Sequence, residues 1–163
     1  MGRKRMGMCG NYMIVNDEMI DSWIAGTIDL YEVELKEEDM LDIDKTWQAI
    51  PYTLCGELMD GESPFCYVVP LLTDQAVEFG EFGAFYLHSE QVKVAYEAIA
   101  NMSESALKEK YHFPTLVEND VYPLHEGDEA KEFFAYMLHH FQSIQAFFKR
   151  AAEQEKGLIF YIS

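Results

Sequence analysis

The sequence predicts a single compact domain of the α+β class, and three observations lead to that prediction. The chain has 163 residues, close to the commonest domain size, and 49% of them are hydrophobic. Apolar residues recur at helical spacing over residues 128–155, which predicts a long C-terminal helix. Short apolar runs stand irregularly between the helices, which favours short mixed or antiparallel strands over a parallel βαβ repeat.

The N-terminal part begins with a strand and a helix. Residues 9–15 are rich in β-forming side chains and predict the strand. Asn16 is a typical N-cap for a helix over residues 17–25, and Gly26 stands just beyond its end. Residues 29–44 contain eight acidic residues and one lysine, so we expect an exposed, irregular connection with some helical turn.

A second helix is predicted to follow, capped by Asp42 or Asp44. Pro51 cannot donate a backbone hydrogen bond, so we expect a kink or a short break near Ile50. The core-facing side of this helix is predicted from apolar residues at helical spacing, namely Ile43, Trp47, Ile50, Leu54 and Leu58.

Two apolar runs predict strands in the middle of the chain. Residues 65–69 form the first run and residues 84–87 the second, and each lies beside turn-forming residues. Ser89 is expected to cap the helix that follows, and Ser103 a shorter helix over residues 104–111.

The C-terminal part is predicted to be a loop, the long helix and a closing strand. The loop covers residues 115–127, Gly157 is expected to end the helix, and residues 158–162 form the strand. The predicted core stripe of the helix consists of Phe134, Met137, Leu138, Phe141, Ile144, Gln145 and Phe148. Tyr136, His140 and Phe147 widen its apolar surface, which indicates either a homodimer interface, a second packed layer or burial beneath a loop.

The charge balance limits the partners. Twelve Lys and Arg face 29 Asp and Glu, which gives a net charge of −17. Such a field repels phosphate backbones and anionic membranes, so we expect neither nucleic acid nor membrane as a partner. A basic protein partner fits this charge, and solubility alone is the alternative explanation.

Cysteine usage and hydropathy indicate a cytoplasmic protein. Cys9, Cys55 and Cys66 are three in number and irregularly spaced, as is usual for reduced core thiols. The sequence has no apolar run of the length of a membrane span and no signal peptide. We expect no cofactor and no structural metal, because a domain of this size does not need a metal for stability.

Several short motifs stand out along the chain. They are Met6-Gly7-Met8-x-Gly10-x-Tyr12, Leu41-x-Ile43-Asp44-Lys45-x-Trp47-x-x-Ile50, Leu54-x-Gly56, Gly83-x-x-Tyr86-Leu87-x-x-x-Gln91-Val92, Val121-Tyr122-Pro123, and Phe148, Ala151 and Gly157 with the closing strand. Together they resemble the YfbM-like family, a bacterial family of unknown function. The resemblance implies a cytosolic α+β domain over residues 6–163, with Met6 as the natural start. We expect residues 1–5 to be either an N-terminal tail or an addition to the natural sequence. It supplies no catalytic residue, and Gln48 and Pro51 stand where many members carry histidine.

Two candidate sites follow. Trp47, Tyr86, Tyr122 and His125 lie in segments that match the family, and they line either a ligand pocket or part of the core.

The second candidate is an acidic interaction patch made of Glu34, Glu37, Glu38 and Asp39. The sequence contains no GxSxG, HExxH or P-loop motif, and whether the protein is an enzyme stays open. The favoured hypothesis is a non-enzymatic interaction protein, of the adaptor or immunity type, that binds a basic protein. The alternative is a small-molecule-binding protein or enzyme that uses the aromatic pocket.

Overall fold

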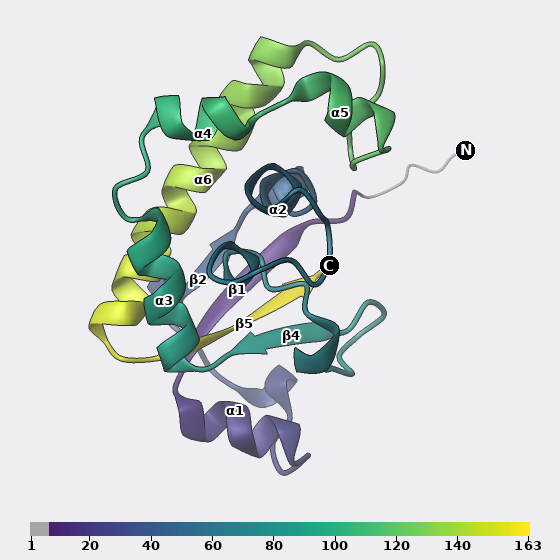
Figure 1. Ribbon diagram of the computed structural model, residues 1–163. Coiled ribbons are helices and arrows are strands. Elements are labelled where there is room, and N and C mark those ends of the chain that lie inside the picture. Colours follow the sequence, from purple (N-terminus) through teal and green to yellow (C-terminus); the bar gives the residue numbers. More distant parts are fainter. Residues whose placement is uncertain (1–6) are drawn as a thin grey trace.

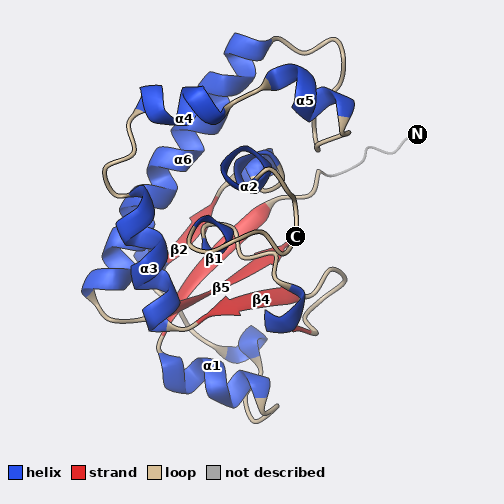
Figure 2. Ribbon diagram, viewed as in Figure 1, coloured by secondary structure: helices blue, strands red, loops and turns tan. Residues whose placement is uncertain are grey.

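A five-stranded antiparallel sheet in the order β2-β1-β5-β4-β3 lies at the centre of the protein (Figures 1 and 2). The computed structural model describes residues 7–163, so the expected tail over residues 1–5 lies outside the described residues. The strands are β1 (Gly10–Val15), β2 (Met40–Asp42), β3 (Ala76–Val77), β4 (Ala84–Leu87) and β5 (Gly157–Ile162). The helices are α1 (Asp17–Ile24), α2 (Ala49–Cys55), α3 (Ser89–Ile99), α4 (Glu104–Lys110), α5 (Phe113–Glu118) and α6 (Ala130–Glu153). These elements confirm the predicted α+β class, with a long C-terminal helix followed by a closing strand.

The closing strand β5 lies in the middle of the sheet. It pairs with β1 on one side and with β4 on the other, so Phe160 is the partner of both Tyr12 and Phe85. The two ends of the described chain therefore meet, because β1 begins the fold and β5 completes it.

Side chains alternate between the two faces of the sheet, and each face has its own apolar cluster. Tyr12 and Ile14 face the larger cluster, which α2, α3 and α6 cover. Met13 and Val15 face the smaller cluster, where α1 contributes Ile20 and Trp23. Figure 1 shows α6 and α3 on one side of the sheet and α1 at its opposite side. Within residues 7–163, no helix combines the length and the apolar character that crossing a membrane requires.

The core stripe predicted for α6 is confirmed at five of its six apolar positions. Phe134, Met137, Phe141, Ile144 and Phe148 are all buried, whereas Leu138 is half-buried. Gln145 is also half-buried, and its amide donates to the carbonyls of Ile99 and Met102 at the end of α3. This polar residue belongs in the stripe because it satisfies carbonyls that a helix end leaves without a partner.

The strand predicted over residues 65–69 is wrong. Phe65–Tyr67 forms a short 3₁₀ helix, and the turn continues through local bonds from Val68 N–H to the Phe65 carbonyl and from Leu71 N–H to that of Val69. The run is apolar because Cys66, Val68 and Val69 are buried in the core, not because they pair in a sheet. A short run of apolar residues is typical both of a buried turn and of a buried strand, so the composition of residues 65–69 does not distinguish the two.

The acidic connection over residues 29–44 contains more structure than predicted. It is mostly exposed and includes 3₁₀ helices at Leu30–Glu32 and Glu37–Asp39, but Leu30 and Ile43 are buried and the segment also supplies the edge strand β2. In the same way, α5 extends into the loop predicted over residues 115–127.

Two predicted helix ends differ from the structure. The break expected near Ile50 lies before it, between a 3₁₀ helix at Asp44–Thr46 and the start of α2, so Pro51 falls in the first turn of α2, where no donor is missed. At the end of α6, Glu155 and not Gly157 adopts the left-handed conformation.

One of the two predicted serine caps is confirmed. Ser103 caps α4 as predicted. In α3, however, His88 occupies the N-cap position, and the Ser89 hydroxyl donates to Asp17 instead.

Candidate functional site

A carboxylate is held in place where the chain leaves β2. Asp44 has a φ of 52°, in the left-handed region that aspartate tolerates better than most residues. Its N–H donates to the Asp42 carboxylate at 2.7 Å, which fixes this turn. The turn directs the Asp44 side chain toward Tyr136 of α6 and toward Cys9, which precedes β1.

The Asp44 carboxylate accepts two hydrogen bonds from side chains. The Tyr136 hydroxyl donates to Oδ2 at 2.7 Å and accepts from the Lys45 N–H at 3.0 Å, while the Cys9 thiol donates to Oδ1 at 3.4 Å. The Tyr136 bond is the main cause that lowers the pKa of Asp44 below its ordinary value of 3.8, against the burial that raises it. Asp44 is therefore ionised at neutral pH.

Asp44 opens onto a cleft of about 490 Å³ between the 3₁₀ helix that it begins and the start of α6. Its lining consists of Asp44, Lys45, Pro123, His125, Asp128, Glu129, Glu132, Phe133 and Tyr136. Four of these residues are acidic, and Lys45 is the one lysine among them. The Lys45 side chain lies against Gly7, where a Cβ atom would come within 2.2 Å of its Cε. It forms no ion pair with the acids of the cleft among the described residues.

The shifted groups around Asp44 have pKa values that move away from neutrality. Burial raises the pKa of Tyr136 well above its ordinary value, and burial followed by the bond to Asp44 raises that of Cys9. Burial also lowers the pKa of His140, whose ring packs edge-on against Tyr136 at 5.1 Å. A general acid or base works best with a pKa near the operating pH, and a thiol reacts as its thiolate. None of these shifted groups has a pKa brought toward neutrality, and the ionised Asp44 carboxylate can accept a hydrogen bond from a cationic donor.

Replacing Tyr136 with phenylalanine is expected to raise the pKa of Asp44, because the main hydrogen bond to the ionised carboxylate is lost. A lowered pKa stabilises the fold above the ordinary pKa of 3.8, and this contribution disappears as the pH falls through the lowered value. The variant should lose that contribution. NMR titration of the Asp44 carboxyl carbon measures the change, and Tyr31→Phe, at an exposed tyrosine, serves as the control.

The predicted pocket residues do not form one site. Trp47 is buried, its indole N–H donates to the Met8 carbonyl at 2.9 Å, and its ring lies 5.9 Å from that of Tyr122. The Tyr122 hydroxyl accepts from the Met8 N–H at 2.9 Å, so both residues hold the chain that leads into β1. His125 is exposed and lines the Asp44 cleft and an adjoining hollow beside Tyr122. Tyr86 lies on the other face of the sheet, where it packs edge-on against Trp23.

Comparison with known proteins identifies the family. The model of a domain of unknown function, DUF1877, matches residues 6–161. This chain belongs to the DUF1877 family. The solved structure of YfbM from Escherichia coli, a protein of unknown function, shares the fold with a TM-score of 0.71 and 17% sequence identity, over 95% of this chain and 99% of that one. No curated protein matches the chain.

The acidic patch of this DUF1877 protein is partly neutralised. Arg150 on α6 lies 3.1 Å from Asp39 and 3.6 Å from Glu38, both through Nη2. Glu34 and Glu37 are exposed and have no ion-pair partner among the described residues. The patch therefore offers two unpaired carboxylates and two that already share one guanidinium.

Of the residues that line the cleft of this DUF1877 protein, the sequence pointed to His125 as a pocket residue but not to Asp44 or Tyr136. Asp44 was interpreted as a helix cap and Tyr136 as part of a wide apolar surface. The sequence offers one indication of this contact. Tyr136 lies off the core stripe of α6, and a tyrosine hydroxyl that is partly buried there needs a hydrogen-bond partner. Within residues 7–163, no three His, Cys, Asp or Glu side chains are grouped so that they could hold a metal ion.

Proposed function

We propose that this protein is a non-enzymatic interaction protein that binds a basic segment of a protein partner and seats one arginine side chain in the Asp44 cleft. The observation that carries the proposal is the cleft itself. Four acidic residues line it, and one of them, Asp44, is oriented by Tyr136 and kept ionised. Carboxylates held in this way form their strongest hydrogen bonds with cationic donors.

The walls of the cleft favour arginine over lysine. Phe133 and Tyr136 lie side by side in it, with ring centroids 5.7 Å apart and planes inclined by 58°. A guanidinium group stacks on aromatic rings and binds carboxylates through two parallel N–H bonds, whereas an ammonium group acts as a compact point charge. A cleft with both rings and carboxylates suits the planar cation.

The charge around the cleft would assist association. The connection that carries Glu34 and Glu37 leads along β2 directly to Asp44, so acidic residues extend from the patch to the cleft. With a net charge of −17, the protein attracts basic partners over a distance that salt shortens to about 8 Å at physiological ionic strength. This long-range attraction raises the association rate, while the cleft governs dissociation.

The test uses a fluorescent peptide of three Arg-Gly-Ser repeats, with citrulline and lysine versions as neutral and ammonium analogues. The double variant Asp44→Asn/Glu132→Gln should weaken binding of the arginine peptide by at least about tenfold, because even one charged hydrogen bond contributes roughly 1.5–3 kcal/mol and 1.4 kcal/mol corresponds to tenfold. Fluorescence anisotropy at low and high salt measures the affinity. The neutral citrulline peptide should bind weakly to the wild-type protein and to each variant.

The control removes the same charge elsewhere. Glu97 and Glu109 are exposed on α3 and α4, outside the residues that line the cleft. Glu97→Gln/Glu109→Gln should therefore change the affinity much less than the cleft variant. If both double variants weaken binding equally, or if the lysine peptide binds as tightly as the arginine peptide, the cleft does not recognise arginine and the proposal is wrong.

A further inference from the structure

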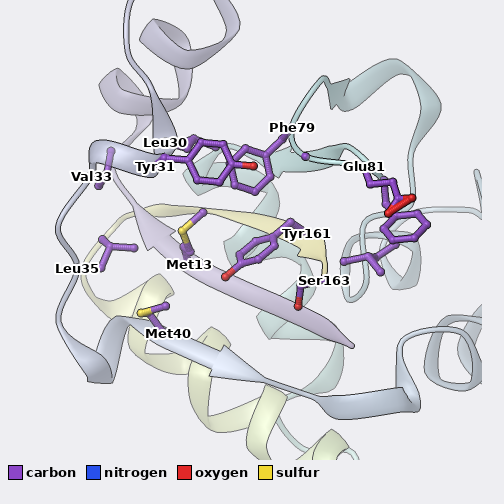
Figure 3. Close-up of a pocket in the computed structure, with 13 residues that line it drawn as sticks. Met13, Leu30, Tyr31, Val33, Leu35, Met40, Phe79, Glu81, Tyr161 and Ser163 are labelled. Atoms are coloured by element: carbon purple, nitrogen blue, oxygen red, sulfur yellow. The ribbon is translucent and has the colours of Figure 1, made fainter. Parts of the chain in front are cut away.

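A second cavity, of about 590 Å³, lies on the face of the sheet that α1 only partly covers. Met13 of β1 and Tyr161 of β5 form its floor, and Met40 of β2 lies at one side (Figure 3). The acidic connection supplies one wall, with Leu30 and Tyr31 among its residues. Pockets that hold small molecules have volumes of roughly 300–1,000 Å³ and mostly apolar linings, so this cavity has the size and character of a ligand site.

Aromatic rings close one end of the cavity. The ring of Tyr31 stacks on that of Phe79 at 4.7 Å with an inclination of 22°, and Phe79 meets Tyr161 edge-on at 5.4 Å. Figure 3 shows the Tyr31 and Phe79 rings side by side above Met13 and Tyr161. Phe82 also lines the cavity from the turn that joins β3 to β4. Four aromatic rings therefore border one space. The Tyr31–Phe79 stack covers one face of each of these two rings, and the electron-rich faces that stay free attract cations.

Large apolar side chains remain exposed around the cavity. Tyr31 is 71% exposed, and Met40 and Phe82 are each 45% exposed. Grouped exposed apolar residues are uncommon on a soluble protein and mark sites where another molecule binds. Methionine suits such a surface, because its flexible thioether adapts to ligands of different shape.

The charge of the residues that line the cavity favours one kind of head group on an apolar ligand. Of the residues between 7 and 163 that line the cavity, Glu81 has the only charged side chain, and no lysine, arginine or histidine is among them. An anionic amphiphile such as a fatty acid would find no cationic group here, and the net charge of −17 would oppose its approach. A cationic head group would find both a carboxylate and aromatic faces.

We propose that this cavity binds a small amphiphile that carries an ammonium group on an apolar or aromatic body. The body lies against Met13, Met40 and Tyr161, and the head group lies between Glu81 and the aromatic rings. The site is separate from the Asp44 cleft, with which it shares no lining residue. If the cavity proves not to bind such a ligand, the proposed interaction function of the Asp44 cleft is not affected.

The experiment uses three probes that share a 4-(1-naphthyl)butyl body and end in trimethylammonium, hydroxyl or carboxylate. Methionine methyl groups labelled with ¹³C locate the binding by NMR, because Met13 and Met40 line the cavity whereas Met137 is a buried residue of α6. We expect the ammonium probe to bind most tightly and the carboxylate probe least tightly. The Met13 and Met40 signals should shift and the Met137 signal should stay in place.

Two variants test the two parts of the proposal. Glu81→Gln should weaken the ammonium probe by about two- to fivefold and leave the alcohol probe unchanged, with Glu97→Gln as the matched control. Val33→Phe narrows the cavity and should weaken all three probes, whereas Val94→Phe, at an exposed position on α3, should weaken none. Leu35→Phe replaces Val33→Phe if the Met137 signal shows that the latter fails to fold. Absence of shifts at Met13 and Met40, or equal binding of the carboxylate and ammonium probes, would overturn the proposal.

Discussion

Replacing Phe141 with alanine is expected to lower the free energy of unfolding by about 3–5 kcal/mol. Phe141 is 1% exposed in the middle of α6 and belongs to the larger core cluster, with Tyr12 and Phe160 of the sheet. Truncation removes the buried ring and leaves a cavity that rigid neighbours on two elements cannot fill. Urea unfolding followed by circular dichroism measures the loss.

Phe82→Ala is the control for Phe141→Ala. Phe82 is 45% exposed, so its removal deletes the same atoms without opening a core cavity. Its effect on the free energy of unfolding should stay within about 0.5 kcal/mol. A loss below about 1 kcal/mol for Phe141→Ala would mean that α6 does not pack as described.

The fold could be predicted wherever local pattern and tertiary environment agree. In α6 the spacing of the apolar residues matches the buried face of the helix. Asn16 caps α1 as its position predicts, since its side chain accepts from the Met19 N–H. The apolar run at 65–69 was misassigned because its burial comes from helices and neighbouring loops, which no short window of sequence contains. β2 was missed because it has only three residues within an acidic segment, too few to show an alternating pattern, and they form a strand only through pairing with β1.

The candidate site could be predicted only in part, because its main contact joins residues that are distant in the chain. Asp44 and Tyr136 are 92 positions apart in the chain, and their hydrogen bond exists because α6 crosses the turn after β2. The sequence alone, by contrast, was enough to exclude Tyr86 from the predicted pocket. It lies between Phe85 and Leu87 in a strand, and alternation sends it to the face opposite those two core residues.

The association between β5 and its neighbours depends on a glycine whose position allows no side chain. A Cβ atom on Gly157 would lie 2.3 Å from the carbonyl oxygen of Leu87 and 2.6 Å from Cδ1 of Ile20. Ile20 can move, but Leu87 cannot, because its backbone pairs with Leu158 at the end of β4, directly before α3. A substitution must therefore displace one of two central strands or the helix that follows.

Gly157→Ala is accordingly expected to lower the free energy of unfolding by at least about 2 kcal/mol, toward the upper part of the range for overpacked cores. Gly127→Ala is the matched control, because nothing lies within 4 Å of its added Cβ and its φ is not positive. That control should be neutral or slightly stabilising, since alanine reduces the entropy of the unfolded chain. Urea unfolding of the two variants side by side measures the difference. Equal stabilities would show that β4 and β5 separate at this point without cost, contrary to the register of the sheet.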